Sequence, residues 1–72
     1  MGMAHGTQRP RTLPVPDEIR GYVAALVREL GPREAARRVG LSRHATLAVA
    51  LGSPVTRGTL AIAREAMGRS AA

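Results

Sequence analysis

The strongest periodic pattern of apolar side chains in this chain lies in residues 17–30. Six apolar residues recur there at intervals of three and four, which places them on one face of a helix. They are Ile19, Tyr22, Val23, Leu26, Val27 and Leu30. Asp17 and Glu18 stand in the first turn, where negative charge suits the helix dipole, and Gly31 follows the last turn. The pattern predicts an amphipathic helix, in which Tyr22 either joins the core or presents its hydroxyl to a helix end or a phosphate.

A second pattern predicts a short helix followed by a tight turn. Pro32 suits the first helical position, because a proline there gives up only an amide hydrogen that has no partner. Ala35, Ala36 and Val39 then fall on one face. Gly40 stands where the chain must reverse, a position that favours a residue tolerant of positive φ. Because Ala36 is small, we expect this helix to cross its neighbour there.

The residues after this turn predict another helix, over residues 43–51. We expect Leu41 to be buried in the turn, and the Ser42 hydroxyl to cap the helix by accepting an amide hydrogen from its first turn. The side chains expected to face outward are Arg43, His44, Leu47 and Ala48, and those expected to face the preceding helix are Ala45, Thr46, Val49 and Ala50. For Leu47, a place in the core is an equal alternative. The two helices and their turn have the layout of a helix-turn-helix.

The last part of the chain predicts a loop and a fourth helix, over residues 57–67. Val55 is expected to return to the core, and Ser53 or Thr56 to cap the helix. Its apolar positions are Leu60, Ala63 and Met67, with Ile62 and Ala66 on a flank. This wide apolar edge indicates either closure over the first helix or an exposed strip for a partner subunit. Residues 68–72 are expected to form a frayed tail.

Length and composition narrow the class of protein. Seventy-two residues make one domain, which we expect over residues 17–67. The chain has no cysteine and two distant histidines, so neither disulfides nor a metal site nor a cofactor is expected. No segment approaches the roughly 20 apolar residues of a membrane span, and the first residues lack a secretory signal, so a cytoplasmic location is expected. A chain this short leaves little room for a ligand pocket, so no small-molecule ligand is expected.

The charge is strongly basic, because eleven arginines face five acidic residues and give a net charge of +6. Five arginines lie in or just after the predicted helix-turn-helix, where Glu34 is the only acid. They are Arg33, Arg37, Arg38, Arg43 and Arg57. Such a basic stripe favours a polyanionic partner, and a solvated face that keeps the protein soluble is the alternative. Either Arg37 or Arg38 can pair with Glu34, and the spacing of four residues favours Arg38, which leaves Arg33 and Arg37 as the better backbone contacts.

The first sixteen residues predict a flexible or extended arm. Residues 1–16 contain three prolines and two glycines and show no apolar period. Arg9 and Arg11 are candidates for contacts from this arm to DNA, and a disordered leader is the alternative. Leu13 and Val15 are expected to pack on the first helix as a short extended lead-in.

Residues 32–51 resemble the DNA-binding helix-turn-helix of bacterial and phage transcription regulators of the Cro/C1, or lambda repressor-like, family. The resemblance rests on a small residue in the first helix, a turn glycine with apolar neighbours, and a serine after them. These residues are Ala36, Gly40, Val39, Leu41 and Ser42. The chain departs from the pattern at Thr46, where a buried Val or Ile is common, and at Pro32, where Gln is frequent.

The resemblance implies an all-α fold, a compact bundle of four or five helices with a central helix-turn-helix. It also implies a sequence-specific transcription regulator, in particular a repressor, that places helix 43–51 in the major groove of double-stranded DNA. A homodimer on an inverted repeat would double the few base contacts of one short helix. The candidates for base contacts are Arg43, His44, Leu47 and Ala48. The candidates for phosphate contacts are Arg33, Arg37, Ser42, Thr56, Arg57 and Thr59.

Other classes of function remain as alternatives. A helical module that binds a protein, such as an antitoxin or antirepressor, would use the charge only for solubility. RNA-binding modules for single strands stack bases on aromatic side chains, and this chain has one tyrosine and no other aromatic residue of that kind. An enzyme is not expected, because His44 has no neighbouring carboxylate or nucleophile in the sequence and there is no phosphate-binding loop.

Overall fold

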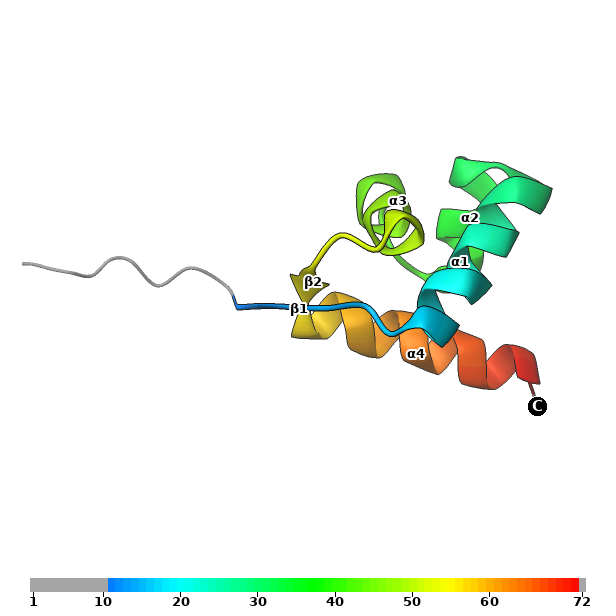
Figure 1. Ribbon diagram of the computed structural model, residues 1–72. Helices are drawn as coiled ribbons and strands as arrows, with labels where there is room; N and C mark the ends of the chain where they lie inside the picture. The colour runs from blue at the N-terminus through cyan, green and yellow to red at the C-terminus, as the bar shows by residue number, and fades with distance from the viewer. Residues whose placement is uncertain (1–10, 72) are drawn as a thin grey trace, which may run out of the picture.

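Four helices account for most of the residues in the computed structural model, which describes residues 11–71 (Figure 1). They are α1 (Asp17–Leu30), α2 (Pro32–Val39), α3 (Arg43–Leu51) and α4 (Arg57–Ala71). Two short strands, β1 (Thr12–Leu13) and β2 (Val55–Thr56), pair antiparallel. Figure 1 shows α2 and α3 in the upper part of the fold and α4 along the bottom. The mostly helical class is confirmed, and the small sheet is a feature that the sequence analysis missed.

The first three helices have the bounds that their patterns predict. At the end of α2, Gly40 adopts a φ of 91°, and its amide donates to the carbonyl of Ala36 over 2.8 Å. The Ser42 hydroxyl caps α3 by accepting from the amide of Ala45 over 3.1 Å. Leu41 is half-buried at the edge of the core and not enclosed as expected, because the turn leaves one side of it open to solvent.

The fourth helix is longer than predicted. It begins at Arg57, where the Thr56 hydroxyl accepts from the amide of Thr59 over 3.2 Å, so Thr56 is the cap. The expected end near Met67 and the expected tail are wrong for residues 68–71, which continue the helix. Gly68 alone does not stop it, and Arg69 lies 3.9 Å from Glu65 one turn earlier. A cation in the last turn also suits the helix dipole.

The core is built from small aliphatic side chains at the centre of the four helices. Its buried cluster consists of Ile19, Val23, Val39, Val49, Val55, Leu60, Ala63 and Ala66. Ala36 is 6 % exposed, as expected for a residue at a helix crossing. The apolar face of α1 is buried unevenly, since Tyr22, Leu26, Val27 and Leu30 are only half-buried. The Tyr22 hydroxyl donates to the carbonyl of Ala66 over 3.3 Å and links α1 to α4.

The small sheet fastens part of the predicted arm to the fold. Thr12 is paired with Thr56, and Leu13 with Val55, so β1 runs beside the segment that leads into α4. Leu13 and Val15 are half-buried against the core. Residues 11–16 therefore run beside the folded helices, and the burial of Leu13 and Val15 agrees with the expected extended lead-in. The alternation of apolar and polar residues that marks a β-strand could not predict this pairing, because each strand has only two residues.

Candidate nucleic-acid interface

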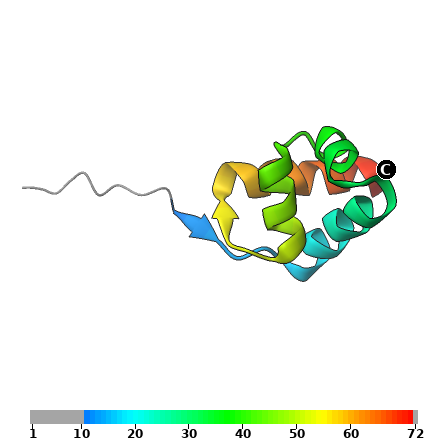
Figure 2. The same cartoon turned by 90° about the horizontal axis from the view of Figure 1, so that it is seen from above.

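Helix α3 is held from one side only. It packs on α1 and α2, and Figure 2 shows it in front of the other helices, uncovered on that side of the molecule. Thr46 and Val49 are fully buried on its inner face. The Thr46 hydroxyl donates to the carbonyl of Ser42 over 2.8 Å, so a threonine is accommodated where the resembling family has Val or Ile. The acceptor is the carbonyl of the residue that caps this helix, and this hydrogen bond explains why burial of the hydroxyl is tolerated.

The amino end of α3 combines a cap with two exposed side chains. Arg43 and His44 are both exposed, as expected, and they stand in the first turn. Their backbone amides precede the first intrahelical hydrogen bond, which runs from the amide of Thr46 to the carbonyl of Ser42. The Ser42 hydroxyl accepts a hydrogen bond as the cap and keeps its own hydrogen for an external acceptor. This end is thus rich in donors, and α3 contains no acidic residue.

The apolar candidates on α3 separate into two positions. Ala48 is half-buried and packs against the core, so it does not face outward as expected. Leu47 is half-buried without belonging to that cluster. Leu51, one turn further on, is 79 % exposed and was missed by the sequence analysis. Its spacing of four residues from Leu47 and eight from Arg43 puts it on the same outer stripe, a signal that was available in the sequence.

The arginines of α2 are arranged differently from the prediction. Arg37, not Arg38, approaches Glu34, with 3.9 Å between guanidinium and carboxylate. Arg38 instead lines a small hollow with Tyr22, Ala66, Arg69 and Ser70, on the side of α4. Arg33 is exposed in the first turn and has no ion pair within residues 11–71. The Glu34–Arg37 pair is exposed, and pairs of this kind contribute only about 0.2–1 kcal/mol, so Arg37 can exchange its partner for a phosphate.

The candidates at the start of α4 form a local cluster. Thr56 and Arg57 are exposed, and the Thr56 hydroxyl donates to the Thr59 hydroxyl over 3.1 Å. Thr59 therefore keeps its own hydroxyl hydrogen for an external acceptor. Arg57 lines the groove on the outer face of α4, together with Leu13. Of the two arm candidates, Arg11 is exposed next to β1, and Arg9 lies outside the described residues.

Three further findings concern other kinds of site. An open groove of about 600 Å³ runs along α4, although no hollow of that size was expected. Within residues 11–71 no three His, Cys, Asp or Glu side chains gather at one place. In the same part of the chain no helix has the length and apolar content that crossing a membrane requires.

Comparisons with known proteins add nothing to the resemblance of residues 32–51. No protein-family model matches the chain, and searches of curated proteins and of solved structures return no match.

Proposed function

We propose that this chain is a transcription regulator, acting as a repressor, that binds double-stranded DNA in a sequence-specific manner through α3. The observation that carries the proposal is the first turn of α3, where exposed Arg43 and His44 follow a serine cap on a helix without acidic residues. The four helices would then have the lambda repressor-like arrangement that residues 32–51 resemble. A homodimer on an inverted repeat is part of the proposal, because one nine-residue helix reaches few bases.

The roles of the side chains follow from their chemistry. Arg43 donates two parallel hydrogen bonds to the O6 and N7 atoms of a guanine, and His44 contacts the neighbouring base edge or a phosphate. Leu47 and Leu51 lie against thymine methyl groups further along the groove. Arg33, Arg37 and the Ser42 hydroxyl bind phosphates and fix the orientation of the helix without reading sequence. Thr59 is a further phosphate contact if the DNA backbone reaches the start of α4.

Selection from random duplexes, followed by binding titrations at several salt concentrations, tests the proposal directly. We expect one enriched sequence with two-fold symmetry, and an affinity that falls steeply with salt because several arginines displace counterions. Arg28 lies in the last turn of α1 and is exposed. Arg28→Ala is the matched control for Arg43→Ala, because each substitution removes one positive charge. A selection without enrichment, or an affinity that does not change with salt, would contradict DNA recognition.

A protein-binding module is the second candidate, and one observation favours it. Leu51 is a large apolar side chain left 79 % exposed on the outer stripe of α3, next to half-buried Leu47. An apolar partner helix could cover the two leucines, as in recognition of a helix in a groove. Binding of that kind would lose little affinity between low and high salt, and Leu51→Ala would weaken it more than Arg43→Ala.

A further inference from the structure

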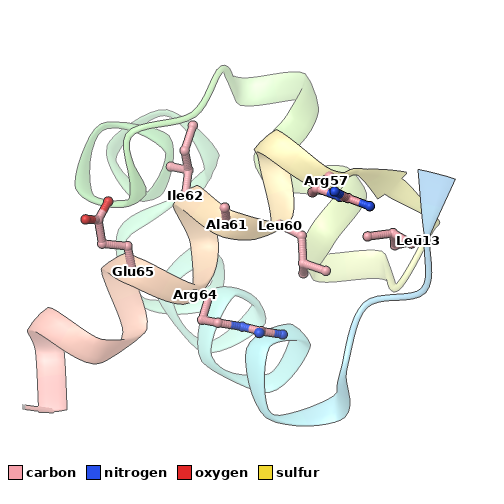
Figure 3. Close-up of a pocket in the computed structure, with 7 residues that line it drawn as sticks. All are labelled: Leu13, Arg57, Leu60, Ala61, Ile62, Arg64 and Glu65. Atoms are coloured by element: carbon pink, nitrogen blue, oxygen red, sulfur yellow. The ribbon is translucent and has the colours of Figure 1, made fainter. Parts of the chain in front are cut away.

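The outer face of α4 contains an apolar groove with charged ends (Figure 3). Half-buried Leu13 and 8 % exposed Leu60 form one side of it, and Ala61 and Ile62 lie beside them. Figure 3 shows Arg57 toward one end and Glu65 at the other, with Leu60, Ala61 and Ile62 between them, Leu13 next to Arg57, and Arg64 on the side of Leu60. Ile62 is 39 % exposed, and within residues 11–70 it is one of two large apolar residues exposed at the surface, the other being Leu51. The groove and the exposed side chain are therefore adjacent parts of one surface.

Arg57 and Glu65 stand at equal distances on either side of Ala61, and Arg64 is the further charged residue of this surface. Arg57, Ala61 and Glu65 are spaced by four residues and form one ridge along the helix. When two helices pack with such ridges side by side, they cross at about 50° in the commonest class of packing. In an antiparallel crossing, the Arg57 end of one ridge meets the Glu65 end of the other, twice. Ala61 then faces its own copy, and its small side chain permits close approach.

We propose that a second copy of this chain occupies the groove, with the two α4 helices crossing antiparallel about a two-fold axis at Ala61. Two ion pairs form between Arg57 of one copy and Glu65 of the other. Ile62 of each copy enters the groove beside Leu13 and Leu60 of the other, because positions equally far from Ala61 are opposed. The groove of one copy and the exposed isoleucine of the other thus complete each other.

Two further observations agree with this occupant. Arg64 is opposed to Gly58 of the second copy, and the space around Gly58 is open, with no atom within 4 Å of an added Cβ. Glu65 now lies 3.9 Å from Arg69 on its own helix, with 74 % of the Glu65 side chain exposed, so this contact yields easily to a better one. Arg64 also lines the groove, so each copy contributes two arginines and one glutamate, and Arg57 and Glu65 are the two of these that the two-fold axis brings together.

The size of the surface predicts a weak dimer. One helical ridge with one added side chain offers less than the roughly 1,200 Å² that stable interfaces bury, so association should depend on concentration in the micromolar range or above. The identity of the occupant rests on the homodimer of the proposed function, but the interface is measured without DNA. A chain that dimerises but ignores every duplex refutes the function and keeps this interface. A chain that binds DNA but never dimerises through α4 keeps the proposed function and refutes this interface.

A charge exchange tests the two ion pairs. Sedimentation of the full chain, from micromolar to millimolar concentration, gives the dissociation constant for the wild type, Arg57→Glu, Glu65→Arg and the double variant. Each single change places like charges together twice, so we expect about a tenfold or greater loss of dimer affinity. The double variant restores both pairs in reverse and should return within about threefold of the wild type. Circular dichroism verifies that each variant keeps its helices.

The matched controls are Arg28→Glu and Glu29→Arg on α1, which change the net charge by the same amounts at exposed positions outside the groove. We expect them to leave the dissociation constant unchanged. The proposal is overturned if the wild type stays monomeric at millimolar concentration, if the controls lose as much affinity as the α4 variants, or if the double variant remains as weak as the single ones. Each of these results means that the second copy does not bind as described.

A crosslink gives an independent measurement, since the chain contains no cysteine. A disulfide needs Cβ atoms about 3.5–4.5 Å apart, and only a residue on the two-fold axis meets its own copy at that distance. Ala61→Cys should therefore form a covalent dimer under mild oxidation at protein concentrations where Arg28→Cys remains monomeric. Equal crosslinking of the two variants would show random collision and would refute the crossing at Ala61.

Discussion

Helices α3 and α4 each bury one face and expose another, but the exposed faces have different chemistry. The outer stripe of α3 has an arginine and a histidine at its amino end, leucines behind them, and no acid. The outer stripe of α4 contains charges of both signs around an apolar centre. A surface of one sign suits a polyanion, whereas a surface that places an arginine and a glutamate on opposite sides of its centre suits a copy of itself. The net charge of the whole chain conceals this difference.

The largest effect should come from the buried side of the fold, and it tests whether the two faces are correctly assigned. Ala36→Leu places three extra carbon atoms at a helix crossing where alanine is 6 % exposed, so overpacking should cost about 1–3 kcal/mol of unfolding free energy. The same substitution at Ala61, on the exposed face of α4, should change the unfolding free energy little. Urea denaturation of both variants measures the contrast. Equal losses would mean that Ala36 is not a packing point.

The next effect concerns the exposed end of α3. Arg43→Ala should weaken binding to the selected duplex by about 1–3 kcal/mol and relax the preference at one base pair, because a bidentate contact to guanine is lost. Arg28→Ala, at an exposed position of α1 outside both faces, should leave this binding almost unchanged. Titrations on the selected and on an unrelated duplex separate the roles. A loss of equal size on both duplexes would make Arg43 a backbone contact and refute its role as a reader.

A smaller effect distinguishes the two helix caps. Ser42→Ala and Thr56→Ala each remove a side-chain acceptor from a helix amino end, which typically costs about 1 kcal/mol of stability. The stability losses should be similar, but the loss of DNA affinity should be larger for Ser42→Ala, whose hydroxyl lies beside the proposed reading turn. Thermal unfolding and duplex titration together give both quantities. If Thr56→Ala weakens DNA binding more, the start of α4 is closer to the phosphates than α3.

The elements that follow from the sequence are those fixed by local chemistry. The apolar period of α1, the glycine at residue 40 and the serine before α3 each determine a structure within a few residues of themselves, so their consequences are predictable. The β1–β2 pairing was not, because it joins Leu13 to Val55 across most of the chain and has no period of its own. The end of α4 was missed because Gly68 is only a weak helix breaker in the absence of a following proline.

The candidate site shows the same limit. Exposure of Arg43 and His44 was predictable, since they follow a cap and precede the buried positions of α3. The partner of Glu34 was not, because Arg37 and Arg38 have nearly the same spacing from it. Arg38 lines the hollow beside Tyr22, a residue distant in the sequence. The groove along α4 likewise exists only once β1 is placed next to that helix.

The smallest effect is a change in the salt dependence of DNA binding, and it tests the partners proposed for Arg33 and Arg57. Arg33→Ala should weaken binding to all duplexes about equally and reduce the slope of log affinity against log salt by about one, since one phosphate contact is lost.

Arg57→Ala distinguishes the two roles proposed for this side chain, a phosphate contact and an ion pair with Glu65 of a second copy. If Arg57 contacts a phosphate, Arg57→Ala reduces the salt slope of DNA binding and leaves the free dimer intact. If Arg57 pairs with Glu65 of a second copy, Arg57→Ala weakens the free dimer, but a dimer already crosslinked through Ala61→Cys keeps its salt slope. Salt titrations of DNA binding with and without the crosslink decide between them, because the crosslink makes the ion pair unnecessary but cannot replace a contact to phosphate.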